Sequence, residues 1–162
     1  DYELILLTSQ LHDMGKIGVP DSVLNKEGKY TDEEFTMMKN HTILAANAIQ
    51  KYAYLLPNSK SLNYTYQMAR SHHEQFSGAG YPDGIAGANI PILARILCVA
   101  DVYDALVSER SYKKAFTHEQ AYNIITQGSG MQFDPQVVAA FQRVHMEFYE
   151  ISQQNMQSLK PQ

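Results

Sequence analysis

The sequence predicts an all-α domain, and three observations support that class. Apolar residues recur every three or four positions along much of the chain, which is the period of a helix with one buried face. No stretch of useful length alternates apolar and polar residues as a strand does. Capping patterns led by threonine or aspartate precede several apolar runs. We therefore expect a compact bundle of about six helices, in a single domain over residues 1–162.

The first segments lead to the first candidate functional residues. Residues 4–11 place leucines at helical spacing and predict a helix that runs into His12, with Gly15 expected to end it. A Thr-x-x-Glu capping box at 31–34 then predicts the start of a longer helix. His41 lies beside the apolar face of that helix.

The middle of the chain alternates helix and loop. After a connection at 54–63, residues 62–73 predict a helix that ends in two adjacent histidines. The loop at 78–84 is rich in glycine and closes with Tyr-Pro-Asp-Gly, which is strong turn chemistry. The most regular apolar spacing follows at 92–106 and predicts a helix that carries Asp101.

The C-terminal part predicts two more helices. A basic turn at 109–114 precedes a capping box at 117–120 and a helix through Ile125. Asp-Pro at 134–135 is an N-cap followed by proline at the first helical position, so the last helix begins there. The polar tail at 154–162 is expected to fray.

Composition excludes several classes of protein. The chain is 44% hydrophobic and 19% charged, which fits a globular domain. Its net charge of -4 argues against a duplex nucleic-acid surface or an anionic-membrane surface. No apolar run approaches the length of a membrane span. The single cysteine, Cys98, rules out an intrachain disulfide, so we expect a buried thiol and a cytoplasmic protein.

Imidazole and carboxylate side chains supply the candidate metal ligands. Without thiolates, such a set suits iron, manganese or zinc. The set is larger than the three protein ligands of a usual single catalytic ion, and it suits two ions that share a carboxylate, with Asp13 as the obvious bridge. Two such ions activate water and clamp a phosphoryl group, so we expect phosphoester hydrolysis. The candidates are His12, Asp13, His41, His72, His73 and Asp101.

Each candidate also has a plain structural interpretation. The His-Asp pair at 12–13 could be a surface charge pair, and the histidines at 72–73 could be one buried and one exposed ring. We take His118 and His145 as ordinary histidines, because neither has ligand-type neighbours in sequence. The two pairs together with Asp101, which is costly to bury unpaired in an apolar helix, favour a metal site.

Other polar residues could act on a substrate. Lys16, four residues after His12, could protonate a leaving oxygen or could be a solvated surface lysine. Arg110 and Lys113 could hold phosphate groups. Tyr81 could stack on a nucleobase or simply pack against its neighbours.

Five blocks of sequence, in this order, resemble the HD-GYP domain, a branch of the HD metal-dependent phosphohydrolases. The resemblance covers about residues 4–141 and implies a helical HD bundle with a Gly-Tyr-Pro loop beside a metal centre, often of iron or manganese. It implies hydrolysis of cyclic di-GMP to pGpG, and sometimes to GMP, while some members prefer cyclic GMP-AMP. It also implies bacterial signalling behind an N-terminal sensory or receiver domain. The blocks are His12-Asp13-Met14-Gly15-Lys16, Lys39-Asn40-His41, His72-His73-Glu74, Gly80-Tyr81-Pro82-Asp83-Gly84 and Ala100-Asp101-Val102-Tyr103-Asp104-Ala105.

The resemblance assigns roles residue by residue. All six candidate ligands match metal ligands of the family. Asp13 and Lys16 would be catalytic, Lys16 by assisting leaving-group protonation. The residues that match substrate-binding positions are Gly80, Tyr81, Pro82, Arg110 and Lys113.

One departure from the family pattern changes the expectation. Family members carry a further histidine on a helix well upstream, whereas the eleven residues before His12 contain none. We therefore expect two metal ions rather than three, and uncovered apolar surface that favours a homodimer. The segment between His41 and His72 is also longer than usual in the family. Two alternatives stay open: a module that binds cyclic dinucleotide without hydrolysing it, and hydrolysis of another phosphoester.

Overall fold

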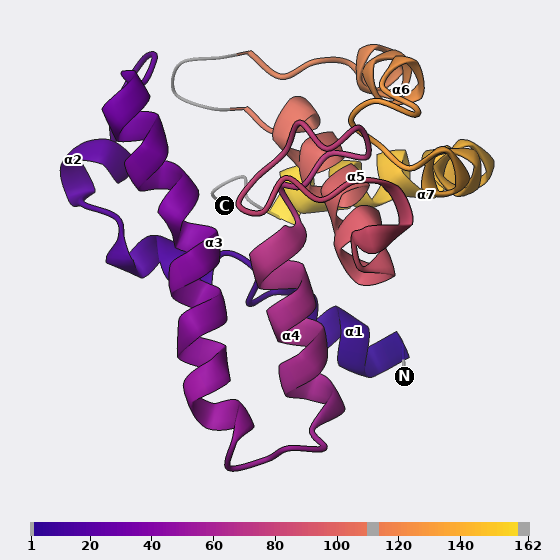
Figure 1. The fold of residues 1–162 in the computed structure, drawn as a ribbon. Coiled ribbons are helices and arrows are strands. Elements are labelled where there is room, and N and C mark those ends of the chain that lie inside the picture. The colour runs from indigo at the N-terminus through magenta and orange to yellow at the C-terminus, as the bar shows by residue number, and fades with distance from the viewer. Residues whose placement is uncertain (1, 110–113, 159–162) are drawn as a thin grey trace.

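A computed structural model describes residues 2–109 and 114–158 of the chain (Figure 1). Over these residues the regular structure is helical, with no strand beyond an isolated bridge. The expected all-α class is therefore confirmed. The α-helices are α1 (Tyr2–Ser9), α2 (Asp21–Leu24), α3 (Asp32–Ala53), α4 (Lys60–Ser71), α5 (Ile92–Val107), α6 (His118–Gln127) and α7 (Pro135–Ser158), and two 3-10 helices are η1 (Met14–Gly18) and η2 (Gly87–Asn89).

Helices α3 and α4 form an antiparallel pair (Figure 1). The expected capping box starts α3, because the Thr31 side chain accepts from the backbone of Glu34 and the Glu34 carboxylate accepts from the backbone of Thr31. Ala45, Ile49 and Ala69 are buried between the two helices, where small side chains allow a close approach. This packing brings the middle of α3 beside the C-terminal end of α4.

Helices α5, α6 and α7 surround a second apolar cluster, in which Cys98 is buried as expected. Burial raises the pKa of the Cys98 thiol to about 12, so this side chain is a packed apolar group at neutral pH. Asp134 caps α7, since its Oδ1 accepts from the backbone nitrogen of Gln136 at 2.7 Å. Its other oxygen pairs with Arg95 of α5 and ties the start of α7 to this cluster.

Two helix ends differ from the sequence expectation. Helix α1 ends at Ser9 instead of running into His12, and the Thr8 hydroxyl donates back to carbonyl oxygens of the preceding turn. Such side-chain bonds compete with continued helix. The His-Asp pair consequently lies in a turn, between α1 and η1. Helix α7 continues to Ser158, past the point where the polar composition predicts fraying.

Several large apolar side chains remain exposed on this fold. Leu6 and Leu7 of α1 are 55% and 63% exposed, and Ile92 and Ile96 of α5 are 47% and 48% exposed. Uncovered apolar surface of this kind favours a homodimer, and dimerisation stays a prediction. None of the helices in the described ranges is both long enough and apolar enough to cross a membrane.

Candidate metal centre

The structure gathers four of the candidate ligands into one cluster where α3, α4 and the turn before η1 meet. Asp13 lies in that turn, His41 lies in α3, and His72 and His73 follow the last turn of α4. One ligand atom from each lies within 4.8 Å of the other three. Residues distant in sequence are thus brought to the separation at which one ion can contact them all.

Gly15 allows this approach. A Cβ atom at this position would lie 1.9 Å from the backbone oxygen of His41 and 2.8 Å from the backbone nitrogen of Ala45. Only a residue without a side chain lets η1 lie directly against α3. The prediction that Gly15 ends the first helix is wrong, because α1 ends at Ser9 and Gly15 lies inside η1, where its role is to set how closely Asp13 approaches His41.

Hydrogen bonds to the backbone orient three of the histidines. Each Nδ1 lies close to a carbonyl oxygen three or four residues earlier, at 2.7 Å in His12 and His41 and at 2.8 Å in His72. A carbonyl oxygen only accepts, so each Nδ1 carries a proton, and in a neutral ring Nε2 then bears the lone pair. The Nε2 atoms of His41 and His72 face each other at 3.4 Å. Two lone pairs at this distance repel unless a cation lies between them.

The Asp13 carboxylate faces two groups of partners. Its Oδ1 lies 3.3 Å from His41 Nε2 and 3.7 Å from His72 Nε2. Its Oδ2 lies 3.4 Å from His12 Nε2 and 2.5 Å from Lys16 Nζ. Asp13 Oδ1 and His12 Nε2 are buried, yet neither has a hydrogen-bond partner among the described residues. Buried polar atoms are rarely left unpaired. The residues present therefore fit a divalent metal ion.

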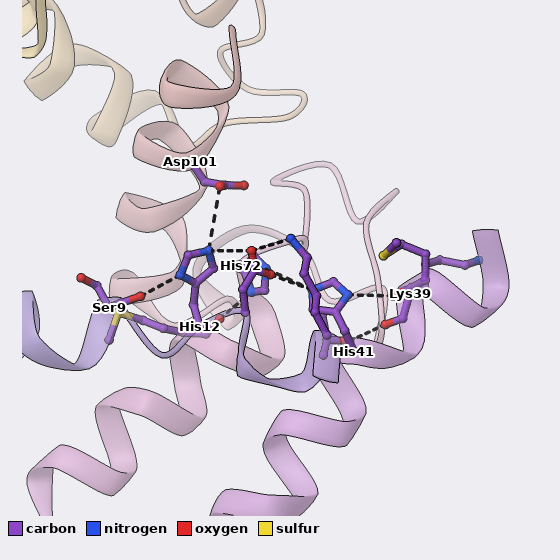
Figure 2. Close-up of polar contacts among 11 residues, drawn as sticks. Ser9, His12, Lys39, His41, His72 and Asp101 are labelled. Carbon is purple, nitrogen blue, oxygen red and sulfur yellow. Dashed lines mark hydrogen bonds and ion pairs between the residues drawn. The ribbon is translucent and has the colours of Figure 1, made fainter. Parts of the chain in front are cut away.

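The two remaining candidate ligands lie at the margin of the cluster. The His12 ring meets the His72 ring edge-on, with centroids 4.9 Å apart. Asp101 extends from α5 and places its Oδ1 3.9 Å from His12 Nε2 (Figure 2). All six candidates thus lie in one region, four of them in a tight group and two beside it.

Charge states in the cluster suit metal binding. Burial raises the pKa of Asp13, but neighbouring histidines and the Lys16 ammonium outweigh it and hold that pKa well below its usual range. Burial lowers the pKa of His41 and, with the adjacent rings, lowers that of His73 to about 2. Burial also lowers the pKa of His12, but Asp13 and a backbone carbonyl overcome this and raise it. At neutral pH Asp13 is therefore a carboxylate, and His41 and His73 are neutral imidazoles, which are the forms that bind metal.

A family model described as the HD domain matches residues 5–137. The chain belongs to the HD domain family. This confirms the family expected from the sequence motifs, and it agrees with the His/Asp cluster as a divalent metal site.

Curated relatives and a solved structure agree with the family. A cyclic di-GMP phosphodiesterase of Vibrio cholerae is 48% identical over 93% of this chain and 30% of its own length. A 3'3'-cGAMP-specific phosphodiesterase 2 of the same organism is 35% identical over 84% of this chain and 25% of its own length. The HD domain therefore spans less than a third of either relative. In fold, the chain is similar to V-cGAP3, a cyclic GMP-AMP specific phosphodiesterase of V. cholerae, with a TM-score of 0.54 and 24% identity over 98% of this chain and 43% of the other.

Tyr81 lies beside the cluster of this HD domain. Its ring stacks on His73 with centroids 4.8 Å apart, and the Phe35 ring meets it at 82°. Its backbone nitrogen donates to the backbone oxygen of His73 at 3.2 Å. Gly80 must lack a side chain, because a Cβ would lie 2.3 Å from the backbone nitrogen of Gln75. These contacts are packing contacts, and stacking of Tyr81 on a nucleobase stays a prediction.

Other predicted residues lie elsewhere. Arg110 and Lys113 are outside the described residues. His118 of α6 faces His145 of α7, and His118 Nε2 is 3.0 Å from His145 Nδ1. The Tyr103 hydroxyl is 2.8 Å from His118 Nδ1. These two histidines satisfy each other, in line with their plain interpretation.

Sequence reasoning missed Glu74 as a separate functional residue. It is 2% exposed, and its Oε1 accepts from the backbone nitrogens of Asp83 at 2.7 Å and Gly84 at 3.1 Å. Arg70 adds two bonds to the Asp83 side chain, at 2.7 and 2.8 Å. The available signal was an acidic residue between the histidine pair and a glycine-rich turn.

The position of Asp101 leads to a test with a matched control on the same helix. We expect Asp101→Ala to weaken metal binding by about 10- to 100-fold, the cost of losing a carboxylate that orients or supplements a ligand. Asp104→Ala removes an exposed carboxylate one turn further along α5 and should leave the affinity unchanged. Competition with a chromophoric chelator measures both affinities. Equal affinities for the two variants would place Asp101 outside the metal site.

Proposed function

We propose that this HD domain is the catalytic part of a metal-dependent cyclic di-GMP phosphodiesterase, which hydrolyses the dinucleotide to pGpG and onward to GMP. The observation that carries the proposal is the cluster in which Asp13 Oδ1 and the Nε2 atoms of His41 and His72 converge to within 3.7 Å of one another. The relative at 48% identity, described as a cyclic di-GMP phosphodiesterase, supports the choice of substrate.

The residues present would hold two divalent ions. Asp13 with His41, His72 and His73 would form one donor set, and Asp13 with His12 and Asp101 would form the other. Asp13 would be the bridge, because its two oxygens face these different neighbours. Iron or manganese is favoured, since the donors are imidazoles and carboxylates without thiolate. When bound, such a pair of ions lowers the pKa of water and stabilises charge on phosphoryl oxygens.

Residues of the chain itself would orient the substrate and protonate its leaving group. The Lys16 ammonium lies 2.5 Å from Asp13 Oδ2, and the Lys16 side chain is 39% exposed. It can therefore reach from the carboxylate to a substrate and donate a proton to the leaving 3′ oxygen. The Gly80-Tyr81-Pro82 loop borders the cluster and limits how the dinucleotide enters. Arg110 and Lys113, matched by motif, would hold its phosphates.

Cyclic GMP-AMP is the alternative substrate. The relative at 35% identity is described as specific for 3'3'-cGAMP, and both dinucleotides present the same kind of phosphodiester to the site. Because the domain covers only 30% and 25% of these relatives, we also propose that it works with a sensory or receiver domain. We propose a homodimer through the exposed apolar surface of α1 and α5.

Metal removal and restoration test the function. We expect anaerobically purified protein to hold about two metal ions per chain and to convert cyclic di-GMP to a linear product. A chelator should abolish turnover, and added iron or manganese should restore it, because the converging donors need a cation. Elemental analysis with chromatography of the products gives both readouts, and parallel assays with cyclic GMP-AMP give the preference. Undiminished turnover after complete metal removal would contradict the proposal, whereas saturable binding without product would favour a binding module.

A further inference from the structure

Glu74 is a buried carboxylate next to the metal ligands that does not join them. It follows His73 directly and is 2% exposed, yet the ligand group within 4.8 Å consists of other residues. Its Oε1 instead accepts two backbone N–H bonds, from Asp83 at 2.7 Å and from Gly84 at 3.1 Å. Its Oε2 is buried without a hydrogen-bond partner among the described residues. The Glu74 side chain thus binds the turn of the loop at Asp83 and Gly84.

That turn is the one that carries Tyr81. The loop is held at its start by the bond from Tyr81 nitrogen to His73 oxygen at 3.2 Å, and at its end by Glu74. An outer ion pair between Arg70 and the Asp83 side chain closes the same turn from α4. Bonds from backbone amides to a carboxylate are charge-assisted and stronger than neutral ones. Glu74 is therefore a buried, charge-assisted link between the loop and the segment that bears the ligands.

We propose that Glu74 is a positioning residue that holds the Tyr81 loop against the metal cluster and thereby sets substrate affinity. The inference rests on the proposed phosphodiesterase function. Glu74 neither binds metal nor transfers a proton. Its carboxylate fixes the distance between the ring of Tyr81 and the ring of His73 on which it stacks, at 4.8 Å between centroids. A substrate then meets a loop that is already ordered, and no binding energy is spent on ordering it.

The chemistry of Glu74→Gln separates this role from others. A glutamine keeps an oxygen where Oε1 accepts from the two amides, and its nitrogen replaces Oε2, which has no partner to lose. A positioning role therefore predicts that glutamine retains much of the function. A metal ligand or a proton carrier needs the carboxylate itself, so those roles predict that Glu74→Gln is as damaging as Glu74→Ala.

We would measure KM, kcat and metal content for both variants, with hydrogen exchange of the amides at 83 and 84. For Glu74→Ala we expect KM for cyclic di-GMP to rise at least about tenfold, with kcat within about threefold and metal content unchanged. The two amides should exchange faster. Glu74→Gln should lie between this variant and the parent. The proposal would be overturned if both variants lost metal, or lost kcat, to the same extent. An unchanged KM in Glu74→Ala would also overturn it.

A surface variant keeps the test valid if Glu74→Ala fails to fold. Arg70→Gln removes only the outer ion pair and should raise KM about threefold, whereas Arg143→Gln on the exposed side of α7 should not change KM. An unchanged KM in Arg70→Gln, with Glu74→Ala unfolded, would count against the anchored loop. If the parent protein lacks turnover, the proposed function fails, and amide exchange with calorimetric affinity for cyclic di-GMP still decides whether Glu74 anchors the loop.

Discussion

Replacing Asp13 with alanine is expected to lower the turnover of cyclic di-GMP by at least about a thousandfold and to remove metal from the protein. The substitution leaves His12, His41 and His72 facing one another without the anion they share. Stabilisation of transition-state charge by metal is worth several kcal/mol, and each 1.36 kcal/mol corresponds to a factor of ten in rate. Measured kcat/KM with elemental analysis of the same sample checks both effects.

The matched control for that variant is Asp21→Ala. Asp21 is an exposed aspartate in α2, the short helix that follows η1. Its loss should change neither metal content nor turnover. Circular dichroism of both variants shows whether the helices remain. An Asp13→Ala protein that stays folded and keeps turnover within tenfold of the parent would refute the assignment of Asp13 as the bridging ligand.

Gly15→Ala is expected to destabilise the fold and the metal site together. The new Cβ would lie 1.9 Å from the His41 oxygen and 2.8 Å from the Ala45 nitrogen. Both are backbone atoms of α3, so neither can move without displacing the helix. Overpacking costs about 1–3 kcal/mol and occasionally more, and we expect the upper end here. For a chain of this size that lowers Tm by roughly 10 °C, which thermal denaturation followed by circular dichroism measures.

Gly18→Ala is the control within the same 3-10 helix. A Cβ at Gly18 would meet the Leu44 side chain at 2.8 Å. That side chain is flexible and 40% exposed, so it can rotate away. We expect a change below about 1 kcal/mol in the free energy of unfolding. If the Tm values of Gly15→Ala and Gly18→Ala were the same, the close packing of η1 on α3 would not be limiting.

The parts of the fold that depend on neighbouring residues were predictable. The capping boxes that begin with Thr31 and Thr117 involve residues three apart, so the sequence alone shows them. The end of α1 at Ser9 was not predicted, because the apolar spacing continues to Leu11, whereas the Thr8 hydroxyl bonds back to the preceding turn and η1 packs on α3. Local periodicity carries no information about that contact.

The candidate site also has some features that the sequence predicts and others that depend on packing. Adjacent pairs such as His72-His73 indicate metal chemistry in the sequence itself. The close approach of the Nε2 atoms of His41 and His72 depends on how α3 packs against α4. No residue pattern in the sequence predicts that packing. Glu74 was missed for a related reason, since its hydrogen-bond partners are backbone amides nine and ten residues away. A side chain that bonds to backbone amides is hard to predict, because the residue types of its partners do not identify them.

The candidate ligands come from both halves of the molecule. Helices α3 and α4 pack around one apolar cluster and α5 to α7 around another, and only Asp101 reaches the site from the second. Ions held by both sides would act as a non-covalent cross-link between the two halves. Metal binding would then stabilise the folded state by mass action. At a free metal concentration one hundred times the Kd, the free energy of unfolding rises by about 2.7 kcal/mol. Metal supply would thus govern how much folded domain persists as well as how fast it turns over.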